Sequence, residues 1–250
     1  MPIDGPTGKY RFLVTFQKGV AATGGESVFY ATDPADMPPV ESEVVMWGDD
    51  PELAAWLKKH GIKVRQYQPG PSKVRQVILV SYAANAGGTA EAWTDLTARI
   101  AQGSTAVFLA HDVFAKGAEP VGWLPLANKG RLERVSEWEF PQVYPKDEWS
   151  TRHPLFDGLP SGGLMDYSFY REIIPDVRYT GQDTPDEAVA GAFRTSHPGA
   201  YCCDLMLSLY KLGEGRFILN SLRVRQELGK DPTAERLLRN MLRYAATKAG

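Results

Sequence analysis

The sequence predicts an α/β fold, with a doubly wound, mostly parallel sheet that has helices on both faces. Two patterns predict it. Short apolar strands alternate with amphipathic helices, and the strand centres are continuously apolar, which is typical of a sheet that is covered on both sides. The size agrees, because 250 residues that are 43% hydrophobic and 23% charged fit one large domain.

The chain begins with a segment that we expect to accompany this domain. Residues 10–16 (YRFLVTF) alternate apolar and polar side chains as a half-buried strand does, and the Gly- and Ala-rich residues 19–25 end that pattern. A proline-rich link follows at residues 33–39. We therefore expect residues 1–40 to form an N-terminal edge or docking strand with its linker, packed on an α/β domain of residues 41–250.

Two strand-helix-strand units follow. Residues 43–47 (EVVMW) predict a strand, Asp50 and Pro51 predict the start of a helix that ends at Gly61, and residues 62–67 predict the next strand. The second unit has a strand at 75–82, a helix at 89–102 and a strand at 105–110. Such units build parallel sheets.

The second half of the chain is less regular. Residues 116–150 carry four tryptophan or tyrosine residues without a clean period and predict a long, irregular, aromatic-rich insertion; they are Trp123, Trp138, Tyr144 and Trp149. Further on, the pattern predicts a strand at 188–195 and a hairpin of 205–212 with 216–222 around Gly213-Glu214-Gly215. The last element is an amphipathic helix at 231–248, with Arg236, Arg239 and Arg243 expected to face water.

Composition excludes several classes of function. The net charge of −2 comes from 28 basic and 30 acidic residues that are interspersed, so we expect no nucleic-acid and no membrane partner. Residues 1–9 lack the pattern of a secretion signal, and no apolar run reaches the length of a membrane span. Localisation is left open. With two adjacent cysteines and four scattered histidines, we expect neither a metal site nor a cofactor.

Ligands of doubly wound folds bind at the carboxyl ends of the strands. Here these ends are residues 47–49, 81–88, 111–112 and 220–221. His111 and Asp112 stand where a nucleophile elbow would present its side chain, and they can act as a base or as ligands but supply no thiol or hydroxyl. The alternative is that Asp112 caps a helix and His111 is an ordinary loop residue.

A second candidate site is residues 152–172 (RHPLFDGLPSGGLMDYSFYRE), which combine carboxylates, an imidazole and flat rings as sugar-binding sites do. We take Asp166 and Glu172, with His111 and Asp112, as candidate catalytic groups. Candidate ligand-binding residues are His153, Asp157, Tyr167, Tyr170, Arg171 and, outside the segment, Trp123. The alternative is that the prolines and glycines fix a tight connection whose aromatic rings pack on the sheet.

Two further groups are candidates on spacing. Cys202 or Cys203 with His197 would make a thiol-dependent hydrolase, although at least one of two adjacent strand cysteines is expected in the core. Arg223 and Arg225 project on one side of an extended segment, where they clamp a carboxylate or pair with Glu227 or Asp231.

Several motifs resemble a known family. Residues 152–160 (RHPLFDGLP), 162–170 (GGLMDYSFY), 215–244 and 29–67 are similar to the class I glutamine-amidotransferase-like region at the carboxyl end of bacterial glycoside hydrolase family 2 proteins. The first of these motifs also resembles trehalose-utilisation-type proteins and the trimerisation domain of some β-galactosidases. The resemblance implies a flavodoxin-like fold, and a preceding β-sandwich to which residues 10–16 would belong, so that the chain would be part of a larger, exported architecture.

The chain departs from this family pattern at one position. A working glutamine amidotransferase has a cysteine on the turn after a central strand, and here that turn carries His111-Asp112, although Ser196-His197-Pro198 is similar to the histidine part of the pattern. The resemblance thus implies a carbohydrate-associated domain without glutaminase activity, which binds a carbohydrate or glycoside or associates with copies of itself. The alternatives are a glycoside hydrolase using carboxylates of Asp112, Asp157, Asp166 or Glu172, and a cysteine-dependent hydrolase.

Overall fold

A computed structural model describes residues 5–15, 24–72, 74–81, 89–134, 147–196 and 200–249 of the chain. Five parallel strands form its centre, in the spatial order β4-β3-β5-β6-β13. Numbered along the chain, this is the order 2-1-3-4-5 of flavodoxin-like folds. The five strands are β3 (Val44–Trp47), β4 (Val64–Gln66), β5 (Val77–Val80), β6 (Thr105–Phe108) and β13 (Gly215–Asn220).

Helices cover both faces of the parallel strands, as the sequence predicts. On one face, α1 (Pro51–Lys59) and α5 (Pro232–Ala249) pack on alternate strand residues such as Val77 and Leu79. On the other, α2 (Ala90–Ala101) packs with Trp93 and neighbours on Ile78 and Val80. Because successive strand side chains point to opposite faces, a continuous apolar strand such as β5 supplies both cores.

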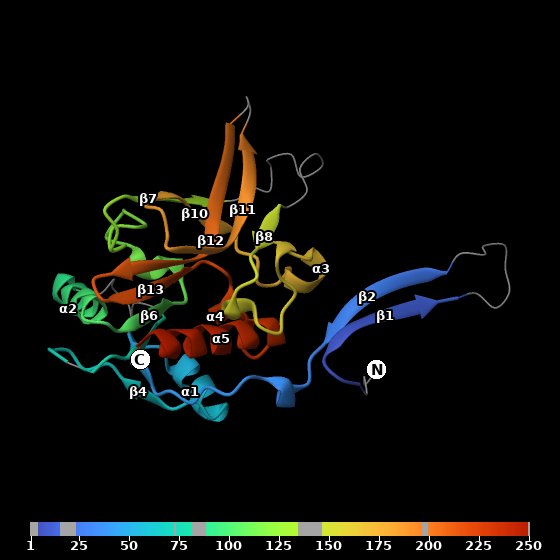
Figure 1. The fold of residues 1–250 in the computed structure, drawn as a ribbon, viewed down its shortest axis with the longest axis horizontal. Helices are drawn as coiled ribbons and strands as arrows, with labels where there is room; N and C mark the ends of the chain where they lie inside the picture. Colours follow the sequence, from blue (N-terminus) through green and yellow to red (C-terminus); the bar gives the residue numbers. More distant parts are fainter. Residues whose placement is uncertain are drawn as a thin grey trace.

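The parallel strands continue into an antiparallel extension. β13 pairs with the long strand β12 (Ala200–Leu212), which pairs with β11 (Glu187–Ser196), and β11 continues through β8 (Glu148–Ser150) to β9 (Gly163–Leu164). The predicted hairpin of β12 and β13 is confirmed, with Gly213 at a φ of 62° in its turn, where glycine is favoured. The extension stands above the parallel strands in Figure 1.

The insertion at residues 116–150 is more regular than expected. It contains β7 (Lys129–Arg134), which pairs with β10 (Val177–Gln182), and β8 lies at its end. These pairings are between strands distant in sequence, and a local periodicity does not reveal them. Trp138 and Tyr144 lie outside the described residues. The remaining short elements are η1 (Pro34–Asp36), η2 (His111–Phe114), η3 (Pro154–Phe156), α3 (Tyr167–Tyr170) and α4 (Val224–Glu227).

The N-terminal segment forms a hairpin of β1 (Gly8–Val14) and β2 (Gly25–Ala31), which extends away from the rest of the molecule in Figure 1. Within the described residues these two strands pair only with each other. The linker behind the hairpin does pack on the domain, because Arg236 Nη2 donates to the carbonyl oxygen of Asp36 at 2.8 Å.

One prediction for the last helix is wrong. Arg239 is 7% exposed rather than directed to water, because its guanidinium donates to Glu235 at 3.0 Å and to the carbonyl oxygen of Pro38 at 3.2 Å. The linker covers this side chain. The apolar period of the helix could not predict a contact with so distant a segment. Among the described residues, no helix has both the length and the apolar character that a membrane span requires.

Candidate functional site

In a sheet of this strand order the point where the winding reverses lies between β3 and β5, and ligands of such folds bind outside the carboxyl ends of these strands. Asp50 follows β3, and Ser81 follows β5. The Asp50 carboxylate accepts hydrogen bonds from the Ser81 hydroxyl and from the backbone N–H of Leu53 at 3.0 Å, which makes Asp50 the predicted N-cap of α1. The Asp50 carboxylate therefore caps α1 and also lies in the crevice at the ends of β3 and β5.

Arg225 of α4 fills this crevice from the other side. Its Nε and Nη2 donate to the two carboxylate oxygens of Asp50, each at 2.7 Å, and Nη2 also approaches Glu52 at 3.2 Å. The fork geometry is that of a strong bidentate pair. The sequence left Arg223 and Arg225 either to clamp a carboxylate or to pair with Glu227 or Asp231. Arg225 clamps the Asp50 carboxylate, and Arg223 contacts Glu227 at 3.1 Å.

The electrostatics of Asp50 follow from these contacts. Burial favours the neutral acid and raises its pKa, but the hydrogen bonds from Arg225, Ser81 and Leu53 outweigh burial, so that the pKa lies below its ordinary value of 3.8. Asp50 is 3% exposed and Ser81 is fully buried. The described part of the winding-reversal crevice is thus closed by an internal ion pair.

An open pocket lies instead beyond the end of β6. It has a volume of about 550 Å³ and is lined by His111 and Asp112, by the turn that follows η2, and by β7 and the start of β10. Ligand pockets for small molecules occupy about 300–1,000 Å³. The polar lining side chains are His111, Asp112, Glu133 and Arg134, and the apolar ones include Leu132 and Val177.

His111 is a half-buried polar group of this pocket. Burial lowers the pKa of its imidazole below 6.5; the carboxylates of Asp112 and Asp176 oppose this shift, and the guanidinium of Arg134 adds to it. At neutral pH the ring is therefore uncharged and offers one hydrogen-bond donor and one acceptor. The alternative capping interpretation of Asp112 is wrong, because η2 begins after Ala110 and has no side-chain cap.

The pocket retains polar groups for a ligand. Among the described residues, the side chains of His111, Asp112 and Arg134 have no partner within hydrogen-bonding or ion-pair distance, whereas Glu133 contacts Arg131 at 2.9 Å. Trp123 does not line the pocket. Its ring stacks at 5.9 Å on Trp93, with the ammonium of Lys116 4.6 Å from its centre, so that it extends the core below α2.

The predicted residues of segment 152–172 lie elsewhere, and several serve packing. Tyr170 is fully buried, and its hydroxyl donates to the carbonyl oxygen of Pro160. Asp166 caps α3 and accepts a hydrogen bond from Tyr30 at 2.7 Å, which lowers the pKa of this carboxyl group. The exposed Glu172 contacts its neighbour Arg171 at 2.8 Å.

Neither Asp166 nor Glu172 lines the pocket at His111. Tyr167 and Asp157 are exposed, at positions that likewise do not line it. The role of Asp166 and Glu172 as an acid and base pair stays a prediction. The contacts of Asp166 are those that hold the N-terminal hairpin to α3.

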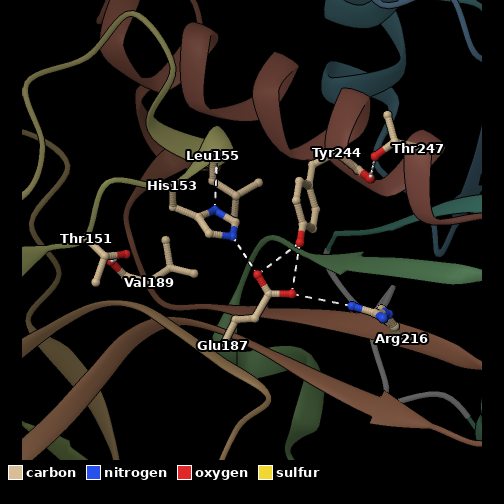
Figure 2. Close-up of polar contacts among 8 residues, drawn as sticks. All are labelled: Thr151, His153, Leu155, Glu187, Val189, Arg216, Tyr244 and Thr247. Atoms are coloured by element: carbon tan, nitrogen blue, oxygen red, sulfur yellow. Dashed lines mark hydrogen bonds and ion pairs between the residues drawn. The ribbon is translucent and has the colours of Figure 1, made fainter.

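His153 belongs to a network that Figure 2 shows, together with Glu187 of β11 and Tyr244 of α5. Its Nδ1 accepts from the backbone N–H of Leu155 at 3.2 Å, so the ring proton is on Nε2, which donates to Glu187 at 2.8 Å. Tyr244 donates to the same carboxylate at 2.9 Å, and Arg216 approaches it at 3.4 Å. Burial and the bond to Glu187 raise the pKa of Tyr244 to about 12.

This network joins η3, β11, β13 and α5, and sequence reasoning missed its centre. Glu187 is the first residue of β11 and belongs to no motif, so only the long-range fold identifies it. The same holds for Glu133 and Arg134, which the sequence places in an irregular insertion although strand β7 carries them to the pocket.

The cysteines have no feature of a nucleophilic site. Burial raises the pKa of the Cys203 thiol, although the neighbouring Trp149 opposes this shift, so the thiol is protonated at neutral pH. Cys202 is half-buried and Cys203 exposed on β12. His197, the proposed partner, lies outside the described residues.

Comparisons with known proteins were made by sequence and by structure. No protein-family description and no curated protein matches the sequence. Among solved structures, the chain is similar to a ThuA-like protein from Bacteroides uniformis (TM-score 0.49, 11% identity, 88% of this chain and 96% of that chain). It is also similar to a cytoplasmic protein from Salmonella typhimurium (TM-score 0.44, 11% identity, 94% and 95%).

A third similarity is to part of an enzyme, the exo-β-1,4-mannosidase of Opitutaceae bacterium strain TAV5 (TM-score 0.40, 14% identity). The match covers 83% of this chain and 35% of the mannosidase. In each case the similarity is in the path that the backbone follows in space.

Proposed function

We propose that this chain is a carbohydrate-binding, amidotransferase-like domain without glutaminase activity, and that it holds its ligand in the pocket at His111. The observation that carries the proposal is the pocket itself. At the turn after β6, where an amidotransferase would present a thiol, His111 and Asp112 line a space of about 550 Å³. The sequence resemblance supplies the ligand class.

The chemistry of the lining supports a neutral, hydroxyl-rich ligand. The uncharged His111 both donates and accepts, the Asp112 carboxylate accepts, and the Arg134 guanidinium donates. Leu132 and Val177 offer apolar surface beside these groups. A sugar ring presents the same mixture, with hydroxyl groups around its edge and apolar C–H faces.

A binding measurement tests this proposal. We expect one or more members of a panel of neutral mono- and disaccharides to bind in calorimetric titrations, and Asp112→Asn to weaken binding at least about tenfold, because a hydrogen bond to a charged group contributes about 1.5–3 kcal/mol. His111→Ala removes an uncharged donor and acceptor and should weaken binding by a smaller factor. No ammonia should be released from glutamine.

The matched control is Asp49→Asn, which removes an exposed carboxylate after β3 that does not line the pocket. Binding should be unchanged in this variant. If no sugar of the panel binds, or if Asp49→Asn weakens binding as much as Asp112→Asn does, the proposal is wrong.

One observation favours a second candidate, a glycoside hydrolase. The carboxylates of Asp112 and Glu133 line the same pocket, as an acid and base pair would require. Hydrolysis of aryl glycosides that is abolished in both Asp112→Asn and Glu133→Gln would support it. Equal rates in the parent chain, in the variants and in buffer would exclude this pair.

A further inference from the structure

Most of the exposed large apolar side chains among the described residues lie in two places, and Val74 and Tyr167 lie outside both. Phe12, Leu13 and Val14, which are 48%, 56% and 43% exposed, lie together on β1. Leu164 on β9 and Phe193 on β11, which are 71% and 56% exposed, lie on the antiparallel extension. Single exposed apolar residues are ordinary on protein surfaces, but groups of them mark interaction sites.

One face of the hairpin of β1 and β2 is mainly apolar, and the other is mixed, with Lys9, Arg11 and Glu26 beside Leu13 and Val28. Its register places Tyr10 opposite Phe29 and Phe12 opposite Ser27, with Val14 next along the strand, so these side chains share one face. The rings of Tyr10 and Phe29 stack at 5.6 Å. Antiparallel sheets with this alternation normally pack the apolar face on a core.

The apolar face of the hairpin has no core in the described molecule. Lys9 and Tyr30, a cross-strand pair on the mixed face, hold the hairpin to α3, where Tyr30 donates to Asp166 at 2.7 Å and its ring lies 4.2 Å from that of Phe169. Figure 1 shows both strands running away from the domain beyond this contact. Seven residues at about 3.3 Å each give the arm a reach of about 23 Å.

The second surface is one face of β8, β9 and β11. Trp149 lies against Gly191, because a Cβ atom on this glycine would come within 2.7 Å of the indole ring. Leu164 stands opposite Trp149, and the ring of Phe193 lies 6.1 Å from that of Trp149. This face is thus a small aromatic platform with exposed apolar side chains, on the outer part of the sheet.

We propose that two copies of this chain form a symmetric dimer by exchanging arms, with the apolar face of each hairpin packed on the Trp149–Phe193 face of the other copy. Sheets pack face to face through such apolar surfaces. A two-fold axis makes the two contacts equal and closes the assembly.

A second copy is the occupant that accounts for both surfaces at once. Each chain carries one apolar arm and one apolar platform, so exchange covers all four surfaces of a pair. A contact between the two arms alone would leave both platforms uncovered. A free two-stranded hairpin is also marginally stable in water, and packing on a sheet supplies the second layer that it lacks.

The oligomeric state of the full chain tests the proposal. In sedimentation velocity over a concentration series, we expect a dimer whose dissociation constant rises at least about tenfold in the arm variant (Phe12→Ser with Val14→Ser) and in the platform variant (Leu164→Ser with Phe193→Ser). Circular dichroism verifies that both fold. The control is Val74→Ser, which changes a 67% exposed apolar residue outside both surfaces and should leave the dimer unchanged.

Mixing the two variants distinguishes exchange from other dimers. A mixed pair retains one native contact, from the intact arm of the platform variant to the intact platform of the arm variant, so heterodimers should form more tightly than either variant associates with itself. A monomeric parent chain would overturn the proposal. So would a platform variant that dimerises as the parent does, which would indicate arm-to-arm contact, or a mixture without heterodimers.

Discussion

At the scale of single residues, Asp50 joins local and long-range structure. As the N-cap of α1, its carboxylate accepts from the backbone N–H of Leu53, three residues away. The same carboxylate binds Arg225, which is 175 residues further along the chain. The sequence identified the first contact, because Asp-Pro-Glu is a helix start, and missed the second. Nothing local distinguishes Arg225 from Arg223, and only the arrangement of β3 and α4 in the fold decides which arginine reaches Asp50.

Loss of Arg225 should destabilise the fold strongly. In Arg225→Met the Asp50 carboxylate would remain buried without its countercharge, and we expect the free energy of unfolding to fall by about 3 kcal/mol in urea titrations. The control Glu52→Gln removes the other contact of Arg225, at a carboxylate whose side chain is 86% exposed, and should cost less than about 1 kcal/mol. Equal losses would contradict a central role for Asp50.

The same pair predicts a dependence on pH. The pKa of Asp50 is lower in the folded than in the unfolded chain, so its contribution to stability is fully present above the ordinary value of 3.8 and is lost as pH falls through the folded value. Acid titrations followed by fluorescence should show a shallower loss of stability below that pH in Asp50→Asn than in the parent chain.

At the scale of elements, the sequence was most informative where periodicity is strong. The strands β3, β5 and β6, the helices α1 and α2, and the β12–β13 hairpin lie where the patterns predict them. The patterns did not predict β2, β7 or β10. β7 and β10 carry charged residues and pair with each other although they are distant in the sequence, and they bring Glu133, Arg134 and Val177 to the pocket.

The contact of Trp149 with Gly191 gives a prediction for the antiparallel extension. Gly191→Ala would place a Cβ atom 2.5 Å from the carbonyl oxygen of Asp204 and 2.7 Å from the indole ring, so β11 or Trp149 must move. We expect a loss of about 2 kcal/mol in thermal or urea unfolding. Gly163→Ala on β9 meets no atom within 4 Å and should change stability by less than about 0.5 kcal/mol.

At the scale of the whole molecule, the sequence predicted the class of fold. It predicted the position of the candidate site only in part. His111 and Asp112 line a pocket at the carboxyl end of β6, and ligands of doubly wound folds bind at such strand ends. In the crevice between β3 and β5, by contrast, Arg225 binds Asp50. The rule concerns strand order and says nothing of the side chains that a later helix inserts. The site predicted in segment 152–172 stays a prediction, because packing and sugar binding use the same residue types.

The hairpin should be dispensable for folding of the domain. Both buried cores begin at Val40 or later, and the described contacts of the hairpin with the domain centre on Tyr30 and Asp166. A chain that starts at Asp33 should therefore unfold within about 1 kcal/mol of the full chain in calorimetry. A truncated chain that does not fold would show that the arm is part of the core.

The place of β13 in the sheet has a consequence for synthesis on the ribosome. β13 fills the position beside β6, yet Asn220 at its end follows its contact Leu109 by 111 residues. At about 5–20 residues per second, the nascent chain waits roughly 5–20 s with one side of β6 unpaired. An open strand edge is a template for pairing with other chains, so translation speed and chaperone access in that interval should affect the yield of native protein.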